Sequence, residues 1–170
     1  ACSDDDDDET DNSLIKSYSS LTVGAQDNPT IGSFLSLGNG TVYTLAQTAG
    51  NKSAIDIFCF YEEGNDMALS SPGGGISGIY MQDSVEIFDS TWNFTGFSQT
   101  DMSVARFDAI ATPDSIVAQF TGTARRKASR LVANNIYAFK TQDAKYGLFK
   151  VISTTGEEAG SITFAVKMQK

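Results

Sequence analysis

Apolar and polar residues alternate with a period of two along much of the C-terminal third of the chain. The alternation is clearest over residues 135–140, 146–152 and 162–168. Such a period turns one row of side chains toward a core and the other toward solvent, as in a half-buried β-strand. The sequence therefore predicts three strands in this region, separated by short polar turns.

The first half of the chain shows the same preference for strands. Residues 14–23 suit an edge strand, because their apolar positions stand among serines and threonines. The Asn39-Gly40 pair separates two β-type runs, 31–37 and 41–46, and predicts a hairpin. Residues 54–61 are apolar on both faces apart from Asp56 and predict a central strand, in which Cys59 packs as a small, inert apolar side chain.

The middle of the chain is less regular. Residues 76–81 and 84–88 are weaker strand candidates, and residues 123–134 fit a helical turn or a strand equally well. Thr112, Pro113 and Asp114 form a helix start, with a capping residue, a proline in the first turn and an acid facing the helix dipole. Together these patterns predict a mainly β protein: one antiparallel β-sandwich over residues 14–170, jelly-roll or immunoglobulin-like, with one or two short helices.

Charge is distributed unevenly. The net charge is −9, yet seven of the 21 acidic residues lie between positions 4 and 11, which leaves 14 acids against 12 bases in the body. A nearly balanced body does not favour nucleic acid, which calls for a basic surface. The one basic cluster comprises Arg125, Arg126, Lys127 and Arg130. It is either a solvated face or a contact for an anionic partner or a sugar.

The residue types present restrict the possible chemistry. The chain has no histidine, which excludes nucleophile systems and zinc sites that depend on one, and we expect no cofactor and no metal. Paired carboxylates would suffice for glycoside hydrolysis, but the candidates stand in or beside turns with no spacing that singles out a pair. They are Glu62, Glu63, Asp66, Asp83, Glu86 and Asp89. Asp56, in the most apolar strand, must face solvent, pair with a base or carry a function.

Three residues are candidates for binding a ligand: Trp92, Tyr61 and Asp56. Trp92 stands near Phe94 and Phe97 and could offer a platform on which a sugar ring stacks. The alternative is that these aromatic side chains fill a core. A concave face that gathers Trp92, Tyr61 or Asp56 would favour the binding hypothesis.

Cys2 is followed by an acidic run that cannot fold into a core, because six adjacent carboxylates repel one another and bury nothing. The run lacks the interleaved spacers and the glycine of a calcium loop, so it does not predict a metal site. One interpretation is a solvated acidic tail with a free thiol. The other is a processed, lipid-modified cysteine after the small residue Ala1.

The second interpretation matches a resemblance. Ala1 and Cys2 resemble the mature end of bacterial lipoproteins, and the residues that follow are similar to the acidic export tag of Bacteroidetes lipoproteins carried to the outer face of the outer membrane. The tag residues are Ser3, Asp4, Asp5, Asp6 and Asp7. Segments 33–37 with Tyr43, 55–57, 137–141, 145–151 and 160–167 also resemble uncharacterised Bacteroidetes surface lipoproteins.

The resemblance implies a domain that residues 1–13 tether to the outer membrane through acyl chains on Cys2, facing the cell exterior. It supplies no catalytic residue. We therefore expect a non-catalytic protein that binds a glycan or an envelope protein. The alternatives are a small carboxylate-dependent glycan hydrolase and a structural or assembly component of the envelope.

Overall fold

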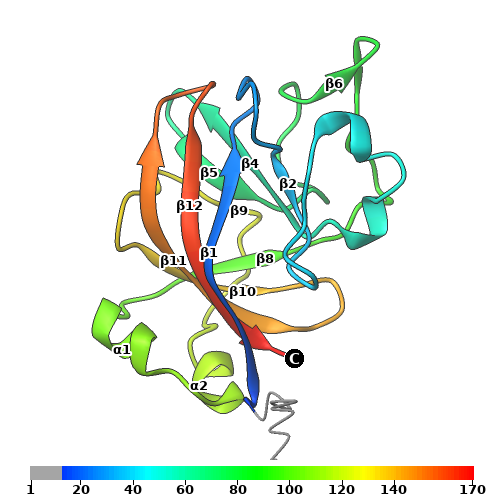
Figure 1. Cartoon of the computed structure of the whole chain (residues 1–170). Helices are drawn as coiled ribbons and strands as arrows, with labels where there is room; N and C mark the ends of the chain where they lie inside the picture. Colours follow the sequence, from blue (N-terminus) through cyan, green and yellow to red (C-terminus); the bar gives the residue numbers. More distant parts are fainter. Residues whose placement is uncertain (1–12) are drawn as a thin grey trace, which may run out of the picture.

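A computed structural model describes residues 13–170 and shows two antiparallel five-stranded sheets (Figure 1). The first sheet has the order β1 (Ile15–Gly24), β12 (Ser161–Gln169), β11 (Tyr146–Thr155), β10 (Ile136–Lys140) and β8 (Gly96–Gln99). The second has the order β3 (Val42–Tyr43), β2 (Phe34–Leu35), β4 (Ile57–Glu62), β5 (Asp66–Ser70) and β9 (Lys127–Ala128). The predicted antiparallel β-sandwich is confirmed.

Three separate cores hold the layers together. The central core lies between the sheets and contains the inward-facing rows of both, including Cys59, Phe97, Phe139 and Phe149. Cys59 is fully buried, as predicted, and its thiol lies 3.5 Å from the sulfur of Met67. Burial of apolar side chains on this scale is the main source of stability in a domain of this size.

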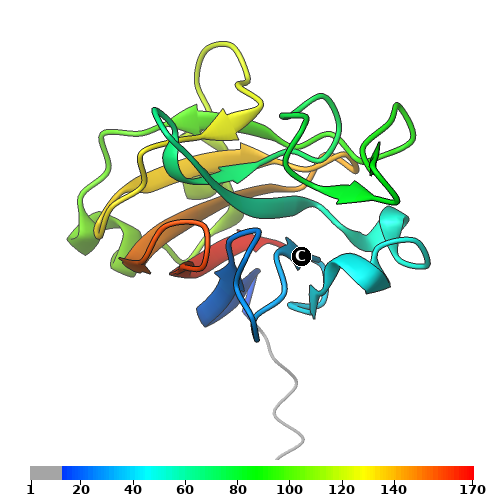
Figure 2. The same cartoon turned by 90° about the horizontal axis from the view of Figure 1, so that it is seen from above.

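The other two cores cover the outer faces of the sheets. Helices α1 (Val104–Ala109) and α2 (Pro113–Val117) lie together at one end of the first sheet (Figure 1). Their side chains Phe107 and Ile116 share an apolar cluster with Leu148. On the second sheet, Tyr80 and Trp92 pack against Phe34 and its neighbours. These two aromatic residues belong to the connection between β5 and β8, which also carries a small hairpin, β6 (Met81–Gln82) with β7 (Val85–Glu86), and extends to one side of the sandwich (Figures 1 and 2).

Most of the predicted strands are present. The edge strand is β1, the hairpin is β2 with β3, and the central apolar strand is β4, with two strands on either side of it. The strands predicted in the C-terminal third are β10, β11 and β12, which pair in sequence. Thr112 precedes α2 as predicted, although its hydroxyl contacts the Ser115 hydroxyl at 2.9 Å instead of capping the backbone.

Several expectations need correction. The central strand begins at Ile57, because residues 52–54 form a short 3-10 helix, so Asp56 precedes the strand instead of lying within it. The strands expected over 76–81 and 84–88 shrink to the two-residue β6 and β7. Strand β8 and helix α1 were not predicted, and the ambiguous segment 123–134 contains the short strand β9.

The segment that contains β9 joins the edges of both sheets. Arg125 forms a bridge with Phe97 of β8 in the first sheet. Two residues later, Lys127 pairs with Ser70 of β5 in the second sheet. This crossing places a run of basic residues along one open side of the sandwich. Within residues 13–170, no helix has the length and apolar character needed to span a membrane.

Candidate ligand-binding groove

The basic residues of this crossing segment line a groove of about 860 Å³, which we call the basic groove. Its charged side chains are Arg125, Arg126, Lys127 and Arg130. Tyr137, Gln99, Asn65, Asn135, Ser129, Val132 and the glycines at 64, 74 and 75 complete its lining. The groove thus combines four of the protein's 12 basic residues with amide, hydroxyl and aromatic groups.

Backbone bonds fix the segment that carries these cations. Phe97 and Arg125 exchange two backbone hydrogen bonds, of 2.7 and 2.8 Å. The amide of Arg130 donates to the carbonyl of Asn65 at 2.7 Å, and Arg130 has a φ of 55°. Left-handed backbone is uncommon for a residue other than glycine, so the β4–β5 turn holds this position in place. The cations therefore stand on a fixed part of the fold.

Two of the cationic side chains are hydrogen-bonded to the groove's own wall. The Arg126 guanidinium donates to the carbonyl of Gly74 at 3.0 Å, and the Arg130 guanidinium donates to that of Gly64 at 3.1 Å. A carbonyl orients a guanidinium without neutralising it, and each guanidinium has five N–H donors. Both side chains therefore keep donors for an additional acceptor.

The charges of the groove are not balanced by ion pairs. In the part of the chain that the structure describes, none of the four cations has a carboxylate within ion-pair distance, whereas Lys52 pairs with Asp89 and Lys150 with Asp108. Arg126 also borders an adjacent pocket that Glu86 and Asp89 line, so its charge is shared between two sites. Arg125, Lys127 and Arg130 carry the positive potential of the groove.

Tyr137 gives the groove an aromatic wall. Its ring stacks on Phe149, with centroids 5.6 Å apart and planes inclined by 7°, and the residue lies opposite Gln99 across the β8–β10 pair. Burial raises the pKa of the Tyr137 hydroxyl, and the positive charge of Arg125 acts in the opposite direction. The ring is therefore packed against Phe149 and lines the same groove as Arg125.

A second pocket, of about 310 Å³, surrounds Asp56. The Asp56 carboxylate accepts the amide of Leu37 at 2.8 Å, and Lys16 donates to the carbonyl of Gly38 in the same turn. Burial raises the pKa of Asp56 to about 6; backbone hydrogen bonds and Lys16 oppose this rise, and Asp143 adds to it. Asp56 is thus partly buried and bound to backbone amides, and it holds the turn between β2 and β3.

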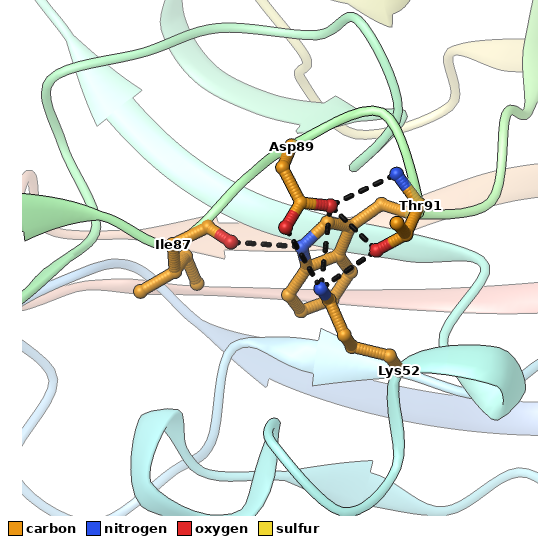
Figure 3. A network of polar contacts seen from close by, with 5 residues as sticks. Lys52, Ile87, Asp89 and Thr91 are labelled. Carbon is orange, nitrogen blue, oxygen red and sulfur yellow. Dashed lines mark hydrogen bonds and ion pairs between the residues drawn. The ribbon is translucent and has the colours of Figure 1, made fainter.

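Trp92 lies in a core instead of on a face. Its side chain is 5% exposed, and the ring packs against Phe88 with centroids 5.1 Å apart. Its indole N–H donates to the carbonyl of Ile87 at 2.8 Å, and Lys52 lies over the ring at 5.3 Å (Figure 3). This position fits the core-packing alternative and leaves no ring face for a sugar.

Polar contacts join the residues that lie over Trp92. The Lys52 ammonium contacts the Asp89 carboxylate at 3.1 Å and the Thr91 hydroxyl at 2.7 Å (Figure 3). Hydrogen bonds from Thr91, together with Lys52, hold the pKa of Asp89 at about 2. The network fixes the segment around Trp92 and gives Lys52 a structural role.

Tyr61 and Asp56 do not share a site. Tyr61 stands toward the far end of β4, half-buried against the central core, and its amide donates to the side chain of Gln26 at 2.8 Å. Asp56 precedes the opposite end of the same strand. The structure therefore does not gather Trp92, Tyr61 and Asp56 on one concave face.

The remaining expectations from the sequence concern the lipidation residue, the export tag and a metal site. Cys2 and the tag residues Ser3, Asp4, Asp5, Asp6 and Asp7 lie outside the described residues. No cluster of three potential metal ligands occurs within residues 13–170.

The sequence predicted the basic residues as a cluster, but it did not predict Asn65, Gln99 and Tyr137. These three residues come from distant parts of the chain, and no local signal links them to the cluster.

No protein-family model matches the chain, and no curated protein sequence does. Among solved structures, it is similar to the crystal structure of a DUF4466 family protein from Parabacteroides merdae, with a TM-score of 0.59 and 18% sequence identity. The similarity covers 93% of this chain but 54% of the other, so this chain spans about half of that protein's length. The likeness shows a shared fold, with a protein from a Bacteroidetes genus.

Proposed function

We propose that this protein is a non-catalytic lipoprotein of the outer cell surface that binds a glycan or a protein partner through the basic groove. The observation that carries the proposal is the set of cations that the fold holds on one open side of the sandwich without carboxylate partners among the described residues. Lone surface charges are usually solvated, but a groove that groups several of them with an aromatic ring and amides has the composition of a binding site.

The surface location rests on the sequence. Cys2 followed by Ser3 and the residues Asp4 to Asp7 is similar to an acylated cysteine with a Bacteroidetes surface-export tag. Two or more acyl chains on Cys2 would give stable membrane anchoring, since each buried methylene contributes about 0.8 kcal/mol. Mass spectrometry of the protein purified from a Bacteroidetes host should show an acyl adduct on Cys2, and an unmodified cysteine would contradict the anchor.

We also propose that the protein is not a catalyst, because the carboxylates that could serve a hydrolase accept hydrogen bonds within the fold. The alternative of a carboxylate-dependent hydrolase would draw on Asp56 and Asp143, which line the same pocket. However, Asp56 accepts a backbone amide and Asp143 accepts the Thr141 hydroxyl at 2.6 Å, so both have structural partners. Turnover of any polysaccharide that is lost in Asp56→Asn would favour the hydrolase instead.

The binding proposal is tested with the full chain and two double variants. Arg125→Gln with Lys127→Gln removes two groove charges. Arg106→Gln with Lys140→Gln removes two charges from side chains that do not line the groove. A glycan array and an affinity capture from envelope extracts should give a ligand that binds the wild type and the control but not the groove variant. Identical binding by all three proteins would show that the groove does not bind the ligand.

A further inference from the structure

We infer that the ligand of the basic groove is an acidic polysaccharide, whose carboxylate or sulfate groups bind the guanidinium and ammonium groups while a sugar ring lies against Tyr137. The inference rests on the proposed function, because it names the chemical class of ligand for the same site. It begins from three properties of the groove: its charge, its lining and its position across the sandwich.

The positive charge of the basic groove favours an anionic ligand. Arg125, Lys127 and Arg130 have no carboxylate within ion-pair distance in the described residues, and Arg126 and Arg130 each keep donors beyond the one bonded to a glycine carbonyl. Guanidinium groups present paired N–H donors that match the two oxygens of a carboxylate or sulfate. Several such groups along one groove fit a ligand that carries repeated negative charges.

The amide and aromatic residues that line the basic groove favour a ligand in which sugar rings carry the negative charges. Asn65, Asn135 and Gln99 bring side-chain amides to the groove. The Asn65 amide donates to Glu62 at 2.6 Å and accepts from the Ser129 hydroxyl at 3.1 Å, and the Asn135 oxygen accepts the amide of Val132 at 2.9 Å. One N–H of Asn65 and both N–H groups of Asn135 therefore remain for the oxygens of a sugar. Tyr137 adds one aromatic ring, which stacks on Phe149. A single-stranded nucleic acid would require stacking platforms for successive bases, and the groove has one such ring.

The position of the groove suits a polymer. Its residues come from the β4–β5 turn, the segment that carries β9, and the β8–β10 pair, so it extends across the edges of both sheets. A volume of about 860 Å³ exceeds what one bound inorganic anion needs and lies in the range of ligand sites. We therefore expect a chain of sugars instead of a small ion.

The decisive experiment compares three oligosaccharides built from galactose-type units: a neutral galacto-oligosaccharide, an oligogalacturonate and a sulfated galactan fragment. Calorimetry with the full wild-type chain should show binding of one or both acidic forms, weakened by added salt, and no binding of the neutral form. The uronate and sulfate arms distinguish the two sources of negative charge.

The variants locate the site. Arg125→Gln with Lys127→Gln should weaken acidic-glycan binding by about tenfold for each lost charge. Arg106→Gln with Lys140→Gln should leave the affinity within about twofold, as expected for sites that do not contact the ligand. Tyr137→Phe should retain the affinity and Tyr137→Leu should reduce it, with circular dichroism and thermal melts confirming that both variants fold.

The outcomes separate this inference from the proposed function. Acidic glycans that bind the wild type and the groove double variant equally would overturn the inference. So would groove-dependent binding of a neutral glycan or a protein with no acidic glycan bound, although that result would leave the proposed function intact. If no ligand of any class depends on the groove, both proposals fail.

Discussion

Phe97 and Arg125 exchange two backbone hydrogen bonds, of 2.7 and 2.8 Å, although 27 residues separate them in the sequence. This pair attaches the basic segment to the edge of the first sheet through its backbone. The Arg125 side chain is therefore not needed to hold the segment and is available to a ligand.

The first prediction follows from that pair. Arg125→Gln should change the free energy of unfolding by less than about 0.5 kcal/mol, as is usual for exposed positions away from structural contacts. Urea denaturation followed by circular dichroism measures this change. A loss above about 1.5 kcal/mol would show instead that the side chain has a structural role.

Trp92→Ala should destabilise the protein by about 3–5 kcal/mol, because it leaves a cavity among Phe34, Phe88 and Tyr80. Trp92→Phe retains an aromatic ring, so it should cost less. Urea denaturation gives both values. Ligand binding by the folded fraction should be unchanged, and a ligand lost in Trp92→Phe without loss of stability would restore Trp92 as a binding residue.

Asp56 should make the stability depend on pH. Its pKa is about 6 in the folded protein and 3.8 ordinarily, so the folded state binds the proton more tightly between these values. Stability is therefore lost as the pH rises from about 4 to about 6, and the deficit persists above that range. Asp56→Asn should raise the free energy of unfolding by about 3 kcal/mol near neutral pH and change it little near pH 4.

Denaturant titrations of wild type and Asp56→Asn at the two pH values provide the measurement. Asp101→Asn is the control, since Asp101 is exposed and should give the same small change at both values. An equal gain at both pH values for Asp56→Asn would contradict the buried carboxylate.

Gly147 should not accept a side chain. It lies opposite Phe139 across the β10–β11 pair, and a Cβ at this position would lie 2.1 Å from Cζ of the Phe139 ring. Because Phe139 is buried in the central core, Gly147→Ala should cost about 1–3 kcal/mol in thermal or urea unfolding. Gly50→Ala is the matched control, because nothing lies within 4 Å of its Cβ. Equal stability of the two variants would contradict this register.

The strands that the sequence predicts best are those with a local signal. β10, β11 and β12 alternate with a period of two, and the Asn39-Gly40 pair marks the turn between β2 and β3. β9 is two residues long and exists because it pairs with β5, which no local pattern reveals. Helix α1 has one local signal, the Ser103 hydroxyl that accepts the amide of Arg106 at 3.2 Å.

The basic groove also combines residues with a local sequence signal and residues that only long-range pairing brings together. The basic residues are visible in the sequence as a cluster, yet whether they form a solvated face or a groove depends on Asn65, Gln99 and Tyr137, which long-range pairing brings to them. Trp92 is ambiguous for the same reason, since its burial depends on contacts with Phe34. Non-local packing decides both questions.

The most direct test of the basic groove is a ¹H–¹⁵N NMR titration of the full chain with an oligogalacturonate or a sulfated galactan fragment. We predict saturable shifts concentrated at the amides of Asn65, Ser129 and Asn135, which require a much higher ligand concentration in the Arg125→Gln, Lys127→Gln double variant. Shifts that cluster around Asp56 and Gln142 instead, or that persist unchanged in the double variant, would contradict the account.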